Sequence, residues 1–380
     1  MTHLFSLTDD QLAIQDMARR FTADTITPFA AQWDEAHEFP RDAIRAAAEL
    51  GFAAIYVSEE AGGIGLGRLD AALIFEALSY GCPTTAAFIS IHNMAAWMID
   101  RFGDDALKSR YLPALVSMDL MASYCLTEPG SGSDAAALRT TARRDGDDYV
   151  VSGTKQFISG AGVNDVYVTM VRTGEPGPKG ISCLVIDRDT PGVSFGLPER
   201  KLGWNASPTA QVIFDNARVP VANRVGDEGD GFRFAMAGLD GGRLNIGACS
   251  LGGAQRCLDE AIAYVKTRAQ FGRTIAEFQN TQFQLADMAT DLEAARALLY
   301  LAAAKVGADA PDKTRFSAMA KKLATDNGSS IVDRALQMFG GYGYLKDYPI
   351  ERFWRDLRVH RILEGTNEVM RMIVGRDLLK

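Results

Sequence analysis

Three patterns of hydrophobic residues follow one another along the chain. From residue 8 to about residue 118, apolar positions recur every three or four residues, the spacing that puts them on one face of a helix. Between residues 120 and 227 the pattern changes to short β-rich runs bounded by turn residues, which is typical of strands. These runs lie at residues 149–151, 166–171, 181–186 and 210–214. Helical periodicity returns after Gly231.

This order predicts an α+β protein of three consecutive domains. We expect an all-helical domain over residues 1–119, a β-domain over residues 120–227 and a helical bundle over residues 228–380. Long helical segments joined by short loops predict that the third domain is an antiparallel four-helix bundle. These segments cover residues 232–269, 278–305, 312–339 and 366–378. Because helices precede and follow the strands instead of alternating with them, the pattern excludes a doubly wound fold.

The charge balance excludes some partners. Among 380 residues, 40 Lys and Arg face 48 Asp and Glu, which gives a net charge of −8. Such a chain has no bulk positive charge to attract nucleic acid or an anionic membrane surface. No stretch approaches about 18 uninterrupted apolar residues, so no membrane span is expected. An anionic ligand must therefore be met by a local basic group.

Cysteine usage and the N-terminus suggest a reducing compartment. The five cysteines are scattered and form no CxxC pair, which argues against a disulfide framework and against a zinc site; no metal is expected. The first ten residues lack the basic and apolar regions of a secretory signal and the arginines of a transit peptide. We therefore expect a bacterial cytoplasmic protein, or a mitochondrial matrix protein if the chain is a mature form.

The chain contains neither a G-x-G-x-x-G nor a G-x-x-x-x-G-K-[ST] string. A Rossmann or P-loop nucleotide site is therefore not expected. Any dinucleotide must bind in another way.

A lone carboxylate near the end of the chain, Glu364, is the strongest candidate for catalysis. It follows Ile362 and Leu363 and precedes Gly365. Apolar neighbours reduce the solvation of a carboxylate, which raises its pKa toward the range where a general base is effective. The alternative is that Glu364 and Glu368 only place negative charge at the positive end of the last helix dipole.

Two further segments can contact a flat polar ligand. The run Tyr124–Asp134 is rich in glycine and hydroxyl groups, and its free N–H groups can bind a polar ring edge or a phosphate. It is equally the composition of an ordinary surface turn. Phe157 and Ser159 offer an aromatic face and a hydroxyl that can stack on and hydrogen-bond a heterocycle. Taken alone, Phe157 is better explained as a core residue.

Three strings together resemble those of the acyl-CoA dehydrogenases, flavin enzymes that desaturate acyl thioesters between the α and β carbons. The strings are Tyr124–Asp134, Gln337–Tyr344 and Glu364–Glu368, and the similarity extends over essentially the whole chain. Three strings in this order on a helix, sheet, helix plan are specific, where each alone is weak. The resemblance implies the family fold, with a barrel-like middle β-domain, and favours Glu364 as a catalytic residue.

The resemblance implies that FAD binds in an extended conformation between the β-domain and the bundle, which explains the missing Rossmann string. One group of matching positions meets the flavin ring: Tyr124, Leu126, Thr127, Phe157 and Ser159. Many relatives carry Trp and Thr where this chain has Phe157 and Ser159. A second group reaches the FAD of a partner subunit or contacts its adenosine half: Arg268, Gln270, Phe271, Phe278, Gln279, Gln337, Gly340 and Gly341.

Other positions match contacts near the start of the last helix and in the thioester site. Thr366, Asn367 and Glu368 match flavin contacts, at a helix N-terminus whose free N–H groups can receive a phosphate. Ser133 matches a position shared by the cofactor and CoA sites. The positions that match thioester contacts are Asp240, Gly241, Gly242, Arg243, Leu363, Gly365 and Arg376. For Arg268 and Arg376 the alternative is a cation that complements a helix C-terminus.

In the family, a carboxylate removes the α proton as hydride leaves the β carbon for the flavin. A subgroup carries this base on the bundle helix, at the position of Gly242. Because glycine stands there, the resemblance leaves Glu364 as the base. It also implies an electron-transfer flavoprotein as the electron acceptor and a homotetramer, a dimer of dimers.

The residue before the base indicates the acyl group. Leu363 stands where many straight-chain members carry Tyr, and a smaller wall leaves room for a branch. Several strings resemble the branch of the family that oxidises isobutyryl-CoA to methacrylyl-CoA in valine breakdown, although Asp240 departs from the Asn of that branch. The alternatives are oxidation of 2-methylbutyryl-CoA or butyryl-CoA, a flavin oxidase that uses oxygen, and a non-catalytic CoA-binding homologue.

Overall fold

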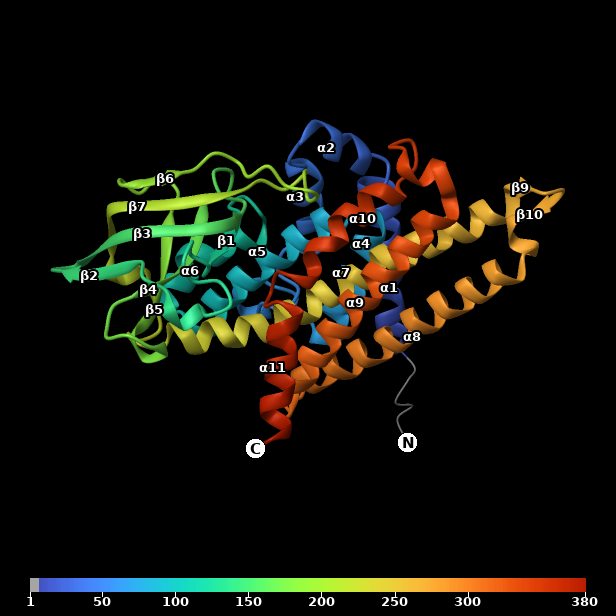
Figure 1. The fold of residues 1–380 in the computed structure, drawn as a ribbon. Helices are drawn as coiled ribbons and strands as arrows, with labels where there is room; N and C mark the ends of the chain where they lie inside the picture. The colour runs from blue at the N-terminus through green and yellow to red at the C-terminus, as the bar shows by residue number, and fades with distance from the viewer. Residues whose placement is uncertain (1–6) are drawn as a thin grey trace.

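Six α-helices form the first part of the chain in the computed structural model, which describes residues 7–380 (Figure 1). They are α1 (Asp9–Phe21), α2 (Ala30–Ala36), α3 (Arg41–Glu49), α4 (Arg68–Gly81), α5 (Pro83–Phe102) and α6 (Asp105–Val116). Helix α1 begins with a capping box, in which Thr8 and Gln11 satisfy each other's free backbone N–H groups. Helix α5 begins with Pro83, a residue suited to a first helical position because it lacks an N–H group.

One sheet follows, with eight strands among the described residues. The strands are β1 (Ala122–Cys125), β2 (Thr141–Asp145), β3 (Asp148–Ser159), β4 (Val166–Arg172), β5 (Ile181–Asp187), β6 (Val193–Phe195), β7 (Thr209–Pro220) and β8 (Arg224–Val225). Their order is β6-β7-β3-β2-β4-β5-β8, and β1 pairs in parallel with β4, with Ala122 opposite Val166. This register brings the end of β1, and the turn after it, toward the helices.

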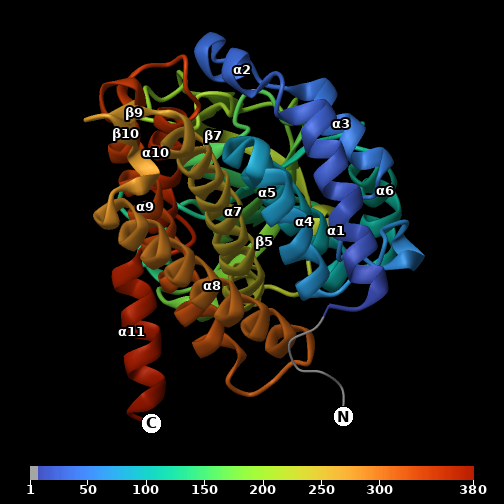
Figure 2. The ribbon, with the colours of Figure 1, turned by 90° about the vertical axis from the view of Figure 1, so that its right-hand side faces the viewer.

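Long helices form the rest of the chain (Figure 2). They are α7 (Gly231–Thr267), α8 (Gln279–Gly307), α9 (Lys313–Phe339) and α11 (Asn367–Leu378). The predicted order of helices, strands and helices is confirmed. The sequence pattern missed a short helix, α10 (Ile350–Arg358), and a small hairpin of β9 (Ala269–Gln270) and β10 (Arg273–Thr274). Helix α10 is largely charged, and it is stabilised by burying Ile350, Phe353 and Leu357.

The helices that precede the sheet in the chain and those that follow it share one hydrophobic core. Phe75 and Leu78 of α4 belong to the same buried cluster as Leu251 and Leu258 of α7. Gly252 makes this contact close, since a Cβ atom at that position would lie 2.0 Å from the Glu76 carbonyl oxygen. Helix α7 is therefore the central element, packed against the first helices as well as the last.

We predict that Gly252→Ala destabilises the protein, although alanine is the better helix former. The new methyl group meets backbone and forces α4 and α7 apart, at a cost of about 1 to 3 kcal/mol. Gly375→Ala in α11 is the matched control: nothing lies within 4 Å of the added Cβ, so helix propensity stabilises the variant by up to about 1 kcal/mol. Thermal unfolding of both variants checks this. A Gly252→Ala protein at least as stable as Gly375→Ala would contradict the packing argument.

Candidate active site

Glu364 lies in a left-handed turn between a 3-10 segment, η8 (Val359–Arg361), and α11. Its φ is 56°, and that of Gly365 is 87°. A residue other than glycine in this conformation carries strain of about 1 to 3 kcal/mol, so the surrounding structure must hold it there. The residue as a whole is half-buried, but its Oε2 atom is buried and has no hydrogen-bond partner among the described residues. The turn thus presents an uncommitted carboxylate oxygen.

Gly242 of α7 lies directly against this carboxylate. A Cβ atom at position 242 would be 2.6 Å from Oε2 and 3.3 Å from Oε1 of Glu364. The carboxylate therefore occupies space that any other residue at position 242 would fill.

Burial raises the pKa of Glu364 to about 7, and the positive charges of Arg243 and Lys321 oppose this rise. A carboxylate with such a pKa is partly ionised at neutral pH and is a competent proton acceptor. The source of the desolvation differs from the prediction. Ile362 is 52% exposed, so the packed helices, more than this neighbour in sequence, remove water from Glu364.

Arg243 and Asp240 form a buried ion pair on the same face of α7. Arg243 Nη1 lies 2.8 Å from Asp240 Oδ1, and Arg243 Nε donates to the Glu364 carbonyl oxygen at 3.4 Å. Thr314 donates its hydroxyl to Asp240 Oδ2 at 2.7 Å. Arg243 and Asp240, for which the sequence predicts CoA contacts, thus pair with each other, and Arg243 also contacts the carbonyl of Glu364.

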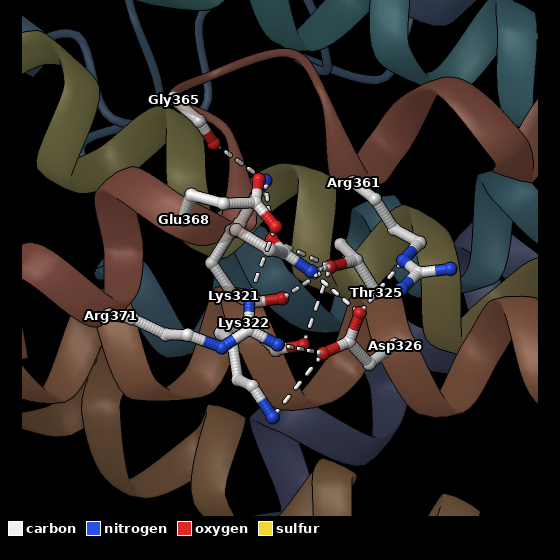
Figure 3. A network of polar contacts seen from close by, with 9 residues as sticks. Lys321, Lys322, Thr325, Asp326, Arg361, Gly365, Glu368 and Arg371 are labelled. Carbon is white, nitrogen blue, oxygen red and sulfur yellow. Dashed lines mark hydrogen bonds and ion pairs between the residues drawn. The ribbon is translucent and has the colours of Figure 1, made fainter. Parts of the chain in front are cut away.

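A second buried cation, Lys321 of α9, contacts the same turn and was missed by the sequence analysis. Its Nζ donates to the Gly365 carbonyl oxygen at 2.8 Å and to Asn367 Oδ1 at 2.9 Å (Figure 3). The Asn367 amide donates in turn to Asp326 Oδ1 at 2.8 Å. In the sequence Lys321 precedes Lys322 in a helical pattern, where two lysines ordinarily indicate a solvated face.

The end of β1 approaches the carboxylate from the sheet. The Tyr124 hydroxyl is buried and has no partner within residues 7–380, and burial followed by the charge of Glu364 raises its pKa. The turn after β1 is held by Glu128, whose Oε1 accepts from Lys155 Nζ at 2.8 Å and from the Thr140 N–H at 2.9 Å. The first residues of the run Tyr124–Asp134 are therefore buried or half-buried and do not form an ordinary surface turn.

Phe157 lies at the end of β3 with a φ of 59° and is 63% exposed. The explanation as a core residue is therefore wrong. Strain and exposure together are unusual for a large aromatic side chain, and they suit a residue that covers a flat ligand. Ser159, two residues further on, is half-buried.

A pocket of about 490 Å³ lies at the far end of α7, beside the β9–β10 hairpin. It brings together five predicted cofactor residues: Arg268, Gln270, Gln337, Gly340 and Gly341. Cβ atoms at both glycines would meet nothing within 4 Å, so the glycine pair borders open space. Phe271 at the tip of the hairpin is 94% exposed, and its ring meets that of Phe278 edge-on. Gln279 begins α8 next to this group.

The remaining predicted residues divide into two sets. Leu363 packs with Trp204 and Ile246 close to Glu364, and the Thr366 hydroxyl caps α11 by accepting from the Val369 N–H. Leu126 is buried and Thr127 is half-buried after β1. The residues that the structure leaves exposed, away from the carboxylate, are Ser133, Glu368 and Arg376.

In residues 7–380, no group of three or more His, Cys, Asp and Glu side chains is arranged to hold a metal ion. No helix in this range combines the length and apolar character needed to cross a membrane.

Family models match three consecutive parts of the chain. The acyl-CoA dehydrogenase N-terminal, middle and C-terminal domain models match residues 8–119, 123–217 and 229–379. A curated relative, the mitochondrial isobutyryl-CoA dehydrogenase of Dictyostelium discoideum, is 56% identical over 375 residues, which are 98% of this chain and 90% of that protein.

Two solved structures share the fold over nearly the whole chain. Butyryl-CoA dehydrogenase from Megasphaera elsdenii superposes with a TM-score of 0.96 at 36% identity, covering 99% of this chain and 100% of that one. A chain solved in work on the electron transferring flavoprotein of Acidaminococcus fermentans gives a TM-score of 0.96 at 41% identity, with 99% of each chain covered.

We predict that Gly242→Ala displaces the Glu364 carboxylate while the fold is retained. The added methyl group lies within contact distance of the flexible end of the glutamate, so that side chain, and not the helix, moves. Gly238→Ala, one turn earlier on α7, is the control, because its Cβ would meet Met94 at an ordinary 3.4 Å. Crystal structures and melting temperatures of both variants check this. An unmoved carboxylate in Gly242→Ala would contradict the assigned contact.

Proposed function

Because the chain belongs to the acyl-CoA dehydrogenase family, we propose that it oxidises isobutyryl-CoA to methacrylyl-CoA, with Glu364 as the base. The enzyme is a flavin-dependent oxidoreductase that uses FAD. One observation carries the assignment of the base: Glu364 Oε2 is buried, has no partner in the described residues, and faces a glycine on α7. The reaction serves valine breakdown.

The residues of this chain supply the proton chemistry. Glu364 Oε2 takes the α proton, and the electron pair of the broken C–H bond forms the double bond to the β carbon. When bound, FAD supplies the acceptor for the hydride that leaves the β carbon. Within residues 7–380 the Glu364 N–H donates to no protein acceptor, so it is free to polarise the thioester carbonyl and thereby acidify the α proton.

The two groups of predicted FAD residues are far apart in one subunit. Arg243 adjoins Glu364, and 25 residues of continuous helix, or about 38 Å, separate it from Arg268. We therefore propose that Tyr124, Phe157 and their neighbours bind the flavin ring of one FAD, while the far pocket binds part of the partner subunit's FAD. The exposed Phe271 suits a residue that is covered on assembly. A homotetramer built as a dimer of dimers allows each subunit to contribute residues to the FAD site of its partner.

Leu363 supports a short branched substrate. It packs with Trp204 and Ile246 beside the base and forms an apolar wall that does not project an aromatic ring toward the α carbon. The relative from Dictyostelium discoideum is named for isobutyryl-CoA. Oxidation of butyryl-CoA is the second candidate, since the structure from Megasphaera elsdenii bears that name.

We also propose the three-domain division at residues 119 and 227, an electron-transfer flavoprotein as the acceptor, and a reducing compartment. All five cysteines are free and buried, which suits a bacterial cytoplasm or a mitochondrial matrix. The curated relative is named as a mitochondrial protein.

We predict that purified yellow protein bleaches on anaerobic addition of isobutyryl-CoA, and that Glu364→Gln bleaches about 10²- to 10⁴-fold more slowly because the general base is lost. Stopped-flow absorbance measures both. Faster bleaching with butyryl-CoA would reassign the substrate. Protein that stays colourless after reconstitution with FAD would contradict the flavoenzyme assignment, and rapid oxygen consumption without another acceptor would favour an oxidase.

We predict that kcat/KM rises about tenfold per pH unit below pH 7 and levels off between pH 7 and pH 8. The ionised form of Glu364 is the active one, and burial places its pKa at about 7, so activity is lost as the pH falls through that value. Steady-state assays from pH 5.5 to 9 give the profile, with a stability check at each pH. A flat profile above pH 5.5 would show that a group with the ordinary pKa of a carboxylate, or no carboxylate, limits the reaction.

A further inference from the structure

Two consecutive carbonyl groups of the Glu364–Gly365 turn are held by buried cations from different helices. Arg243 Nε of α7 contacts the Glu364 carbonyl oxygen, and Lys321 Nζ of α9 donates to that of Gly365. Lys321 also reaches the Asn367 side chain at the first residue of α11, so it joins both sides of the turn. Among residues 7–380, no backbone N–H group donates to either of these two carbonyl oxygens.

Both hydrogen bonds that Lys321 Nζ donates go to the turn and to the start of α11. Lys321 is fully buried, and it has no carboxylate within ion-pair distance in residues 7–380. The neighbouring Lys322 pairs instead with Asp326 at 3.3 Å, as Figure 3 shows, and is partly exposed. A buried ammonium without a direct counter-ion costs folding free energy, so a structural benefit alone is a weak explanation for it.

We propose that Lys321 is a positioning residue for proton removal: its ammonium group holds the Glu364–Gly365 turn in the left-handed conformation and thereby keeps the Glu364 carboxylate against Gly242. This inference rests on the proposed function, because it concerns the base of that reaction. The turn carries strain, and the two hydrogen bonds from Lys321 offset this strain in the arrangement that presents Oε2 to the α7 glycine.

Lys321 also acts on the charge of the base. Glu364 is faced by Arg243 from α7, Lys321 from α9, Tyr124 from β1 and Tyr56 from the segment before α4. Both tyrosines have raised pKa values and are neutral near pH 7, so the two cations alone stabilise the carboxylate.

Lys321 itself remains largely protonated at neutral pH. Burial lowers its pKa to about 8, while the charge of Glu364 opposes this change. Arg243 lowers the Lys321 pKa further, and Asp326 and Glu368 raise it. Removal of the lysine charge therefore raises the pKa of Glu364, and the acid limb of the activity profile moves to higher pH.

Three variants test the proposal in the FAD-loaded enzyme. In Lys321→Met we expect the acid limb of kcat/KM to move up by about one pH unit, which lowers kcat/KM about fivefold at pH 7 and about tenfold well below it. Lys321→Gln removes the charge and keeps an amide donor, so it should shift the limb by a similar amount even if Lys321→Met does not fold. Lys322→Met is the matched control on the same helix and should leave the limb unchanged.

Hydrogen exchange gives a measurement that does not depend on activity. In Lys321→Met we expect faster amide exchange over residues 359–370, because the turn has lost its anchor, while Lys322→Met matches the wild type. An unshifted acid limb in both Lys321 variants, with unchanged exchange, would overturn the positioning role. That outcome differs from failure of the proposed function, in which the wild-type enzyme itself does not oxidise the thioester or Glu364→Gln retains full activity.

Discussion

A carboxylate that is removed from water but given no hydrogen-bond partner is the constraint on which the site depends. Such a group is unfavourable in a protein interior unless nearby cations and a fixed backbone compensate. Here Gly242 provides the space, Arg243 and Lys321 provide positive charge, and the left-handed turn sets the direction of Oε2. The same desolvation that is costly in the resting protein gives Glu364 the raised pKa that the proposed base needs near neutral pH.

Helix α7 connects the parts of the molecule that this site needs. Near its beginning it carries the glycine and arginine that face Glu364, and in its middle Gly252 admits the backbone of α4. Its far end leads into the hairpin that carries Phe271 and borders the far pocket. A shift of this helix would therefore move the groups beside Glu364 and also the residues proposed to bind the FAD of a partner subunit.

The sequence predicted the fold order, which depends on local patterns, and it pointed to Glu364, whose buried and unpartnered Oε2 suits the proposed base. It could not reveal Lys321, since a lysine pair in a helix has the same pattern whether solvated or buried. It predicted CoA contacts for Asp240 and Arg243 but did not anticipate that a spacing of three residues on a helix lets them pair with each other. It attributed the desolvation of Glu364 to its neighbours Ile362 and Leu363, of which only Leu363 is packed inside the protein. Burial by distant helices is a property of packing that the sequence pattern does not show.

The separation of the two cofactor regions along α7 has a consequence for how the protein behaves on dilution. If each FAD is enclosed by two subunits, cofactor binding and subunit association are linked equilibria, and each strengthens the other by mass action. Free FAD then raises the apparent affinity between subunits, and a high subunit concentration reduces the loss of FAD. If the exposed Phe271 contacts both the partner subunit and its FAD, this side chain contributes to both linked equilibria.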